Sequence, residues 1–197
     1  MTPITRFAAA LALAVSCVAA SAQPARYELD PDHAVFAFLV DHVGYAKVLG
    51  QFLSTRGSYV FDERTGALSE LRIEADAASV FTNHRRRDDH LKGPDFLDVR
   101  RHPKLVFTAA GAKRTGDRTF EIEGELELLG RRQPLVLQAT WNRSARTPVI
   151  PLIGPYVMGV SARGAFRRSA YGMSYGVDDG WVGDEVQLIL EVEAHRR

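Results

Sequence analysis

Cysteine is almost absent from this sequence. The single Cys17 lies in an apolar N-terminal stretch, so residues 23–197 contain no thiol. An internal disulfide is therefore excluded for that part of the chain, even in an oxidising compartment. No thiolate is available there as a metal ligand either. The fold has to be stabilised by a hydrophobic core and hydrogen bonds.

The sequence also lacks an excess of charge of either sign. It contains 25 Lys and Arg against 24 Asp and Glu. The first 22 residues hold one Arg and no acid, which leaves 24 basic and 24 acidic side chains in the remainder. Such a chain is not suited to bulk electrostatic binding of nucleic acid or of an acidic membrane. Even the Arg-rich segment 85–101 interleaves five Arg and one Lys with four Asp, which disfavours nucleic acid.

The N-terminus carries the features of an export signal. Arg6 precedes an apolar run over residues 7–20, and small residues at 20–22 precede Gln23. The run is too short for a comfortable membrane span. Ala14 stands where a lipoprotein signal has a bulky aliphatic residue. We expect residues 1–22 to be a cleaved signal peptide and the mature protein to be periplasmic; a retained anchor and a lipidated cysteine are the weaker alternatives.

Metal-binding motifs are missing. His-Glu-x-x-His does not occur, and His84, His90 and His102 are spaced wrongly for one face of a helix. His33 and His42 each follow an Asp and could meet the others in space. An ordinary surface or core histidine is the simpler interpretation of each, so we expect no metal site.

Motifs for nucleophilic and acid–base catalysis are missing as well. The GVSARG stretch at 159–164 is one residue too long for a Gly-x-Ser-x-Gly elbow and lies in a strand-like run. The acidic pairs at 88–89 and 178–179 are adjacent in sequence, so their side chains diverge instead of converging on one bond. We expect no catalytic residue, no enzyme activity and no cofactor.

What the sequence has in abundance is period-two alternation of apolar and polar residues. In FEIEGELEL, residues 120–128, four glutamates alternate with apolar residues or glycine. LRIEAD (71–76) and EVQLILEVEA (185–194) repeat the pattern, and turn signals separate the runs. This indicates one all-β domain over residues 23–197, an antiparallel barrel of about eight strands. We expect strands near 34–40, 48–61 (one bent strand or two), 69–76, 104–110, 118–128, 134–142, 156–166 and 185–194.

The interior of such a barrel is either filled by side chains or wide enough for one ligand. Several residues on the inward face are small: Ala37, Ala75, Gly124, Ala139, Ala162 and Gly164. Beside large aromatic residues they are compatible with a tunnel, and equally with ordinary packing of large against small side chains. The sequence leaves both interpretations open.

One stretch breaks the alternation. Asn83 is a good N-cap for a short helix over residues 84–92, and a Gly-Pro stop signal follows it. With a second brief turn, this places a helical segment near residues 84–99. Asp88 and Lys92 are four apart and can pair. The three arginines that open the helix could receive an anionic head group at its N-terminus, or they could pair with nearby acids on a solvated face.

The same stretch contains a family signature. Residues 87–91 read RDDHL, 95–99 read DFLDV and 102–107 read HPKLVF. Over essentially all of residues 26–194, the sequence resembles the YceI-like, polyisoprenoid-binding family. At residues 129–134, LGRRQP stands where the family often has a His-Gly pair before its Lys-Pro turn. Further matching pieces, in order along the chain, are YELDPDH (27–33), DHVG (41–44), GQF (50–52), FD (61–62), GEL (124–126), QPL (133–135) and FRRSAYGM (166–173).

The resemblance implies an extended lipocalin-like antiparallel barrel with a short helical segment near its mouth. It also implies an exported protein that encloses a long isoprenoid lipid, a polyprenyl phosphate or an isoprenoid quinone, in an apolar tunnel for transport, storage or stress protection. A carrier needs a dry cavity and no nucleophile, which agrees with the missing motifs. The alternatives are an enzyme acting on such a lipid through polar residues at the barrel mouth, and a scaffold with a filled barrel.

Candidate residues for the lipid follow from this interpretation. His84, Arg87 and His90 are the candidates for contact with a head group at the mouth, and strand parity selects those that line the tunnel. An apolar, Pro-bounded loop at residues 149–153 could touch a membrane transiently, although packing over its own barrel is the favoured alternative. The expected partner is an isoprenoid lipid and not nucleic acid, and the oligomeric state stays open, a homodimer included. The residues expected to line the tunnel are Phe36, Phe38, Val40, Phe107, Phe120, Ile122, Leu126, Trp141, Met158 and Phe166.

Overall fold

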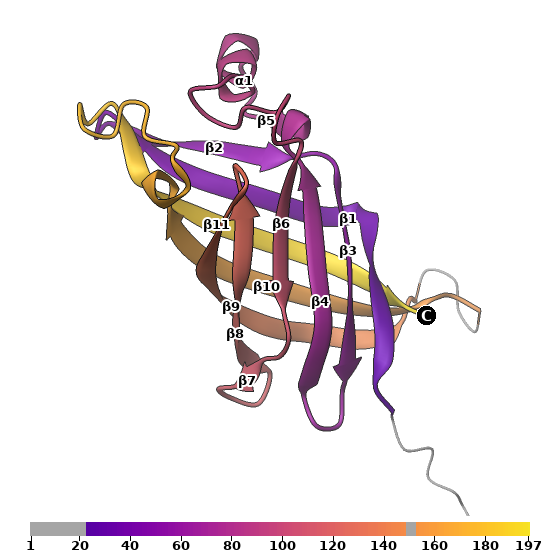
Figure 1. The fold of residues 1–197 in the computed structure, drawn as a ribbon. Helices are drawn as coiled ribbons and strands as arrows, with labels where there is room; N and C mark the ends of the chain where they lie inside the picture. Colours follow the sequence, from indigo (N-terminus) through magenta and orange to yellow (C-terminus); the bar gives the residue numbers. More distant parts are fainter. Residues whose placement is uncertain (1–22, 149–152) are drawn as a thin grey trace, which may run out of the picture.

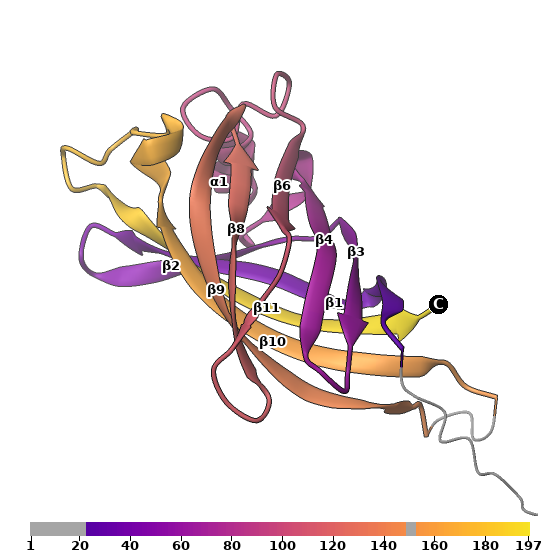
Figure 2. The ribbon, with the colours of Figure 1, turned by 60° about the horizontal axis from the view of Figure 1, so that its bottom comes forward.

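Eight strands close into an antiparallel barrel in the computed structural model, which describes residues 23–148 and 153–197 (Figure 1). Neighbouring strands pair, and β11 pairs back with β1, so the sheet closes on itself (Figure 2). The predicted all-β barrel of about eight strands is confirmed. The expected signal peptide, residues 1–22, lies outside the described residues. Around the wall the strands are β1 (Ala25–His42), β3 (Thr55–Asp62), β4 (Ala67–Asp76), β6 (Lys104–Ala109), β8 (Thr119–Leu128), β9 (Arg131–Arg146), β10 (Tyr156–Arg167) and β11 (Val182–Arg196).

Three shorter strands extend this wall. The strand β2 (Ala46–Phe52) pairs with the C-terminal half of β1, while β3 pairs with its first residues. Together β2 and β3 therefore follow β1 along its length, and the expected strand at 48–61 is two strands. The strand β5 (Val80–Phe81) pairs with β2, and β7 (Lys113–Arg114) pairs with β8.

The first strand is longer than its alternation predicted. It begins at Ala25, whereas the pattern placed its start near residue 34. The pairing with β11 shifts register between Leu29 and Ala34, so residues 30–33 bulge opposite Glu193. Pro31 and the aspartates beside it suit a bulge and interrupt the alternation of side chains. The pattern therefore missed the segment before the bulge.

The helix α1 (Arg85–Leu91) lies where it was expected, but its caps differ. Asn83 has a φ of +60° and is not the N-cap; His84 takes that position, and its Nδ1 accepts a hydrogen bond from the Arg87 backbone N–H at 3.3 Å. Asp88 does not pair with Lys92. Its buried carboxylate accepts hydrogen bonds from the Thr82 N–H and hydroxyl at 2.8 and 2.6 Å, because Thr82 offers two donors away from water.

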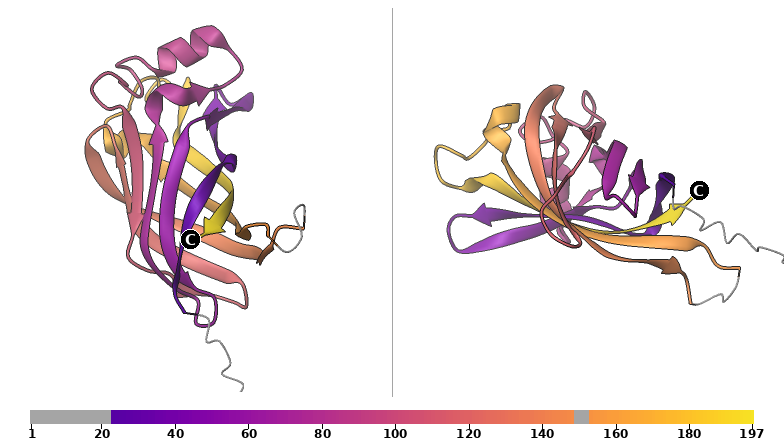
Figure 3. Two further views of the ribbon diagram at one scale, coloured as in Figure 1. Left: turned by 90° about the vertical axis from the view of Figure 1, so that its right-hand side faces the viewer. Right: turned by 90° about the horizontal axis from the view of Figure 1, so that it is seen from below.

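The two ends of the barrel differ in construction. At one end, called the mouth, lie α1, the β1–β2 hairpin and the loop 172–181, which follows the short 3-10 helix η2 (Arg168–Tyr171) (Figure 3). The 3-10 helix η1 (Ala77–Ser79) connects β4 to β5. None of the helices within residues 23–148 and 153–197 is long and apolar enough to cross a membrane.

The end opposite the mouth is closed by tyrosines around one carboxylate. Tyr27 and Tyr156 both donate their hydroxyl hydrogen bonds to Glu63, and the Tyr27 ring stacks on Tyr59 with centroids 5.3 Å apart. Tyr27 is fully buried, and burial together with the adjacent Glu63 carboxylate raises the pKa of its phenol. This end is therefore filled by packed tyrosines, two of which are hydrogen-bonded to Glu63.

Candidate functional site

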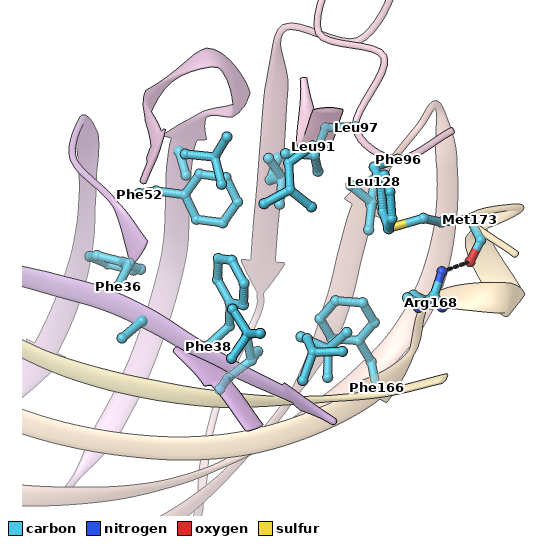
Figure 4. Close-up of a pocket in the computed structure, with 18 of the residues that line it drawn as sticks. Phe36, Phe38, Phe52, Leu91, Phe96, Leu97, Leu128, Phe166, Arg168 and Met173 are labelled. Carbon is cyan, nitrogen blue, oxygen red and sulfur yellow. Dashed lines mark hydrogen bonds between the residues drawn. The ribbon is translucent and has the colours of Figure 1, made fainter. Parts of the chain in front are cut away.

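The barrel interior contains a cavity of about 530 Å³ on the side of the mouth. Figure 4 shows that its walls are apolar side chains from both the strands and the helical segment. Phe36, Phe38 and Phe166 project from strands, and Leu91, Phe96 and Leu97 project from α1 and the residues after it (Figure 4). Pockets for small ligands measure roughly 300–1,000 Å³ and are mostly apolar. This main cavity has the size and chemistry of a site for an apolar molecule.

Incomplete burial of inward side chains indicates that the main cavity is open. Phe38, Val40, Phe52, Phe166 and Leu188 line the cavity, yet each retains intermediate exposure to solvent. In a filled barrel these positions would be among the most buried of the chain. The interpretation of a tunnel, which the sequence left open, therefore describes this half of the barrel.

Glycines in the wall make room for the aromatic rings. A Cβ atom at Gly50 would lie 2.2 Å from the Phe38 ring, and one at Gly124 would lie 2.6 Å from the Phe107 ring. The rings cover these two positions on the neighbouring strands, which only a residue without a side chain permits. These two glycines therefore pack against large aromatic residues, as in an ordinary core. They also allow the aromatic rings to lie close to the barrel wall.

A second cavity of about 90 Å³ lies deeper in the barrel. It shares four lining residues with the main cavity, namely Phe36, Ile73, Leu137 and Leu190. Beyond them Phe61 packs edge-on against Phe120 and Trp141, with ring centroids 5.7 and 5.6 Å apart. The bore is therefore wide at the mouth and narrow towards the tyrosine-closed end.

All ten residues selected by strand parity lie on these two cavities. These side chains therefore face the interior, whereas a strand register shifted by one residue would have turned them outward. That these side chains touch a ligand stays a prediction. The main cavity is lined by Phe36, Phe38, Val40, Phe107, Leu126 and Phe166, and the inner cavity by Phe120, Ile122, Trp141, Met158 and again Phe36.

The polar residues predicted for the mouth divide into two groups. Arg87 and His90 line the main cavity, but His84 does not, because its exposed ring caps α1. Arg87 donates from Nε to the Thr82 hydroxyl at 2.7 Å and from Nη2 to the Thr82 carbonyl at 2.8 Å. Its guanidinium is thus held against the protein and still faces the cavity.

His90 occupies a polar and aromatic corner of the mouth. Its Nε2 lies 2.9 Å from Oδ2 of Asp95, and its ring packs edge-on against Phe96 and Tyr175 at 4.9 and 5.1 Å. A histidine held by a carboxylate is positioned to donate a hydrogen bond or to move a proton. The corner can therefore orient a polar head group beside the apolar cavity.

Arg168 is the residue at the mouth that the sequence analysis missed. Its side chain is almost fully buried and lines the main cavity, and its guanidinium carbon lies 5.8 Å from the centre of the Phe96 ring (Figure 4). None of the described carboxylates forms an ion pair with it. Its partners are four backbone carbonyl oxygens at 2.7–2.9 Å, those of Met173, Tyr175, Val182 and Gly183.

This arrangement places an unpaired positive charge beside an apolar space. Burial lowers the pKa of the Arg168 guanidinium, and Asp184 opposes that shift through space. The Asp184 carboxylate itself accepts hydrogen bonds from the Ser169 N–H and hydroxyl, both at 2.9 Å. The period-two alternation could have indicated that Arg168 faces inward, because it lies two residues after Phe166, which also lines the cavity. With Arg87, it makes the mouth suited to an anionic or oxygen-rich head group.

Exposed apolar side chains surround the mouth. Val43 and Tyr45 lie on the β1–β2 hairpin, and Trp181 ends the loop 172–181; 90% of Tyr45 and 53% of Trp181 is accessible. The Val43 N–H donates to the Trp181 carbonyl at 3.1 Å, so the two segments are joined. Of the loop predicted to touch a membrane, residues 149–152 lie outside the described residues, and Ile153 is exposed, away from the mouth.

Comparisons with known proteins agree with this architecture. The family model of the YceI-like domain matches residues 27–194. The UPF0312 protein of Azotobacter vinelandii is 34% identical over 192 residues, which cover 96% of this chain and 97% of that protein. The YCEI protein of Campylobacter jejuni superposes with a TM-score of 0.71 at 25% identity, covering 80% of this chain and 90% of that one. A domain from Saccharophagus degradans, described as polyisoprenoid binding, has a TM-score of 0.65 at 11% identity, covering 89% and 100%.

Proposed function

The chain belongs to the family of YceI-like domains, and we propose that it is a binding protein that encloses a long isoprenoid lipid in its main cavity. The observation that carries the proposal is the apolar cavity of about 530 Å³ beside the mouth. The related fold described as polyisoprenoid binding supports the class of ligand. With the export signal that the sequence predicts, the proposal extends to a periplasmic carrier for transport, storage or stress protection.

Burial of the lipid tail supplies enough free energy for such a role. Each methylene-sized group transferred from water contributes about 0.8 kcal/mol, so ten groups contribute roughly 8 kcal/mol. That corresponds to near-micromolar affinity before the cost of association is subtracted. No charged contact is required to hold the tail. The polar mouth is therefore free to select the head group.

The mouth favours a head group that is anionic or rich in acceptor oxygens. Arg87 and Arg168 present guanidinium groups, and His90 presents an imidazole fixed by Asp95. A polyprenyl phosphate would place its phosphate here, and an isoprenoid quinone would place its carbonyl oxygens here. In both cases the tail would extend past Phe38 and Leu188 into the main cavity.

Mass spectrometry of an organic extract of the purified protein tests the proposal. We expect an isoprenoid lipid to be recovered unchanged, and its amount to fall when the main cavity is filled by mutation. The His90–Asp95 pair keeps one alternative open, an enzyme acting on such a lipid. Turnover of added lipid that disappears in His90→Ala would favour the enzyme. A protein that yields no lipid and binds no apolar dye would overturn both.

We also predict that lipid passes between the membrane and the cavity at the mouth. Aromatic side chains with a polar atom suit the membrane–water interface, and Tyr45 lies beside the cavity opening. Tyr45→Ser should slow lipid transfer from vesicles at least about tenfold, because the loss of one inserted aromatic is worth about 1.5–3 kcal/mol. The melting temperature should not change, because Tyr45 is 90% exposed.

The matched control is Ile153→Ser, since Ile153 is 83% exposed and lies away from the mouth. Transfer by this variant should equal that of the unmodified protein. If Ile153→Ser slowed transfer and Tyr45→Ser did not, the loop at residues 149–153 would be the membrane contact instead of the mouth.

A further inference from the structure

Three side chains that can bind a metal converge on the outer wall of the barrel, away from the main cavity, and a fourth, His195, approaches one of them there. The bulge of β1 carries Asp30 and His33, and the facing part of β11 carries Glu193 and His195. One ligand atom from each of Asp30, His33 and Glu193 lies within 4.8 Å of the other two. Nε2 of His195 lies 3.3 Å from Oδ2 of Asp30.

The Asp30 carboxylate is the centre of this group. Its side chain is only 12% exposed, and its Oδ2 lies 2.7 Å from Nδ1 of His33 as well as near His195. The hydrogen bond with His33 lowers the pKa of Asp30, and the same contact raises the pKa of the His33 imidazole. One carboxylate oxygen thus lies between two imidazole nitrogens, an arrangement in which a cation can replace the protons.

Access to the group is open on one side. A groove of about 430 Å³ runs along the wall beside it and is lined by His33, Glu193 and Glu191 among others. The four side chains need not supply every ligand, because the groove has room for water on the exposed side. The site is therefore reachable by a hydrated ion.

We propose that Asp30, His33, Glu193 and His195 form a binding site for a divalent transition-metal ion. Two imidazole nitrogens and two carboxylate oxygens are a ligand set that suits Zn²⁺, and the imidazoles disfavour Mg²⁺ and Ca²⁺, which prefer oxygen. The site joins β1 to β11, the pair of strands that closes the barrel. A bound ion would stabilise the closed barrel by mass action.

The sequence predicted no metal site for a reason of spacing. Asp30 and His33 lie near the start of the domain, whereas Glu193 and His195 lie near its end. Motif searches detect ligands that are close in sequence, and these four meet only because the first and last strands pair. The bulge adds a second condition, since it places both residues of β1 opposite Glu193.

Titration calorimetry with Zn²⁺ at neutral pH, on the full chain without added histidines, tests the proposal. We expect the heat of binding to saturate at one ion per chain, and the melting temperature to rise with the Zn²⁺ concentration. Acidification should weaken binding, because protons compete with the metal for the imidazole nitrogens.

Variants distinguish this site from adventitious surface binding. His33→Ala and His195→Ala should each weaken Zn²⁺ binding at least tenfold, while His84→Ala, which removes the exposed histidine at the N-cap of α1, should leave it unchanged. Glu193→Gln keeps the shape of an exposed side chain and so weakens binding without disturbing the fold. Absence of Zn²⁺ binding, or equal affinity in all four variants, would overturn the proposal. Lipid content should be unaffected in every case, which separates this result from the proposed function.

Discussion

Replacing Arg168 with methionine is expected to lower the free energy of unfolding by about 3–5 kcal/mol. Methionine replaces the aliphatic stem of arginine but has no hydrogen-bond donor, so the four backbone carbonyls that Arg168 now satisfies would lose this partner. A buried acceptor without a donor costs about 1–3 kcal/mol. Part of the total cost is offset because the variant no longer buries the charge of the guanidinium. Denaturant titration followed by circular dichroism measures the change.

Two comparison variants, one at Arg167 and one at Arg168 itself, test whether the effect is specific to the buried guanidinium. Arg167→Met removes an exposed guanidinium one residue earlier, and it should change stability by no more than about 0.5 kcal/mol. Arg168→Lys keeps the charge but cannot reach four carbonyls with one ammonium group, so its stability should lie between those of the original protein and Arg168→Met. If Arg168→Met were as stable as Arg167→Met, the guanidinium would not be what holds the loop 172–181 against the barrel.

The barrel could be predicted because its pattern is local. Along β8, Phe120, Leu126 and Leu128 are buried while the alternating glutamates face outward, as the pattern requires. A period of two determines which face each side chain takes, and it therefore also placed ten residues on the inner wall. The bulge in β1 was missed because the alternation of inward and outward side chains is interrupted over its four residues.

The polar features were harder to predict because the alternation indicates which face a side chain takes, but not which polar atoms it meets. The alternation of apolar and polar residues does not indicate that Thr82 will donate two hydrogen bonds to the buried Asp88 carboxylate. Two of the four carbonyl partners of Arg168, those of Met173 and Tyr175, belong to a loop without a repeating pattern. His84 was expected at the lipid head group, whereas the local geometry of the helix start uses its ring as a cap. In each case the backbone geometry of an irregular segment decides which polar atoms meet.

The volume of the main cavity leads to the second large effect. Leu188 lies on β11 between Phe38 and Gly164, and its partly exposed side chain faces the cavity. Leu188→Trp should fill space that the lipid tail would occupy. Excluding about four methylene-sized groups costs roughly 3 kcal/mol, which is about a hundredfold in Kd. Titration with an isoprenoid quinone or an apolar dye, together with the lipid content of the extract, measures the loss.

The adjacent residue provides the control for this substitution. Ile189 follows on the same strand but does not line either interior cavity, because successive side chains alternate between the faces. Ile189→Trp should therefore bind lipid normally. Stability of Leu188→Trp should change by less than about 1.5 kcal/mol, because an existing cavity accepts the larger ring with little strain. Undiminished affinity in a folded Leu188→Trp protein would mean that the ligand binds somewhere other than the barrel interior.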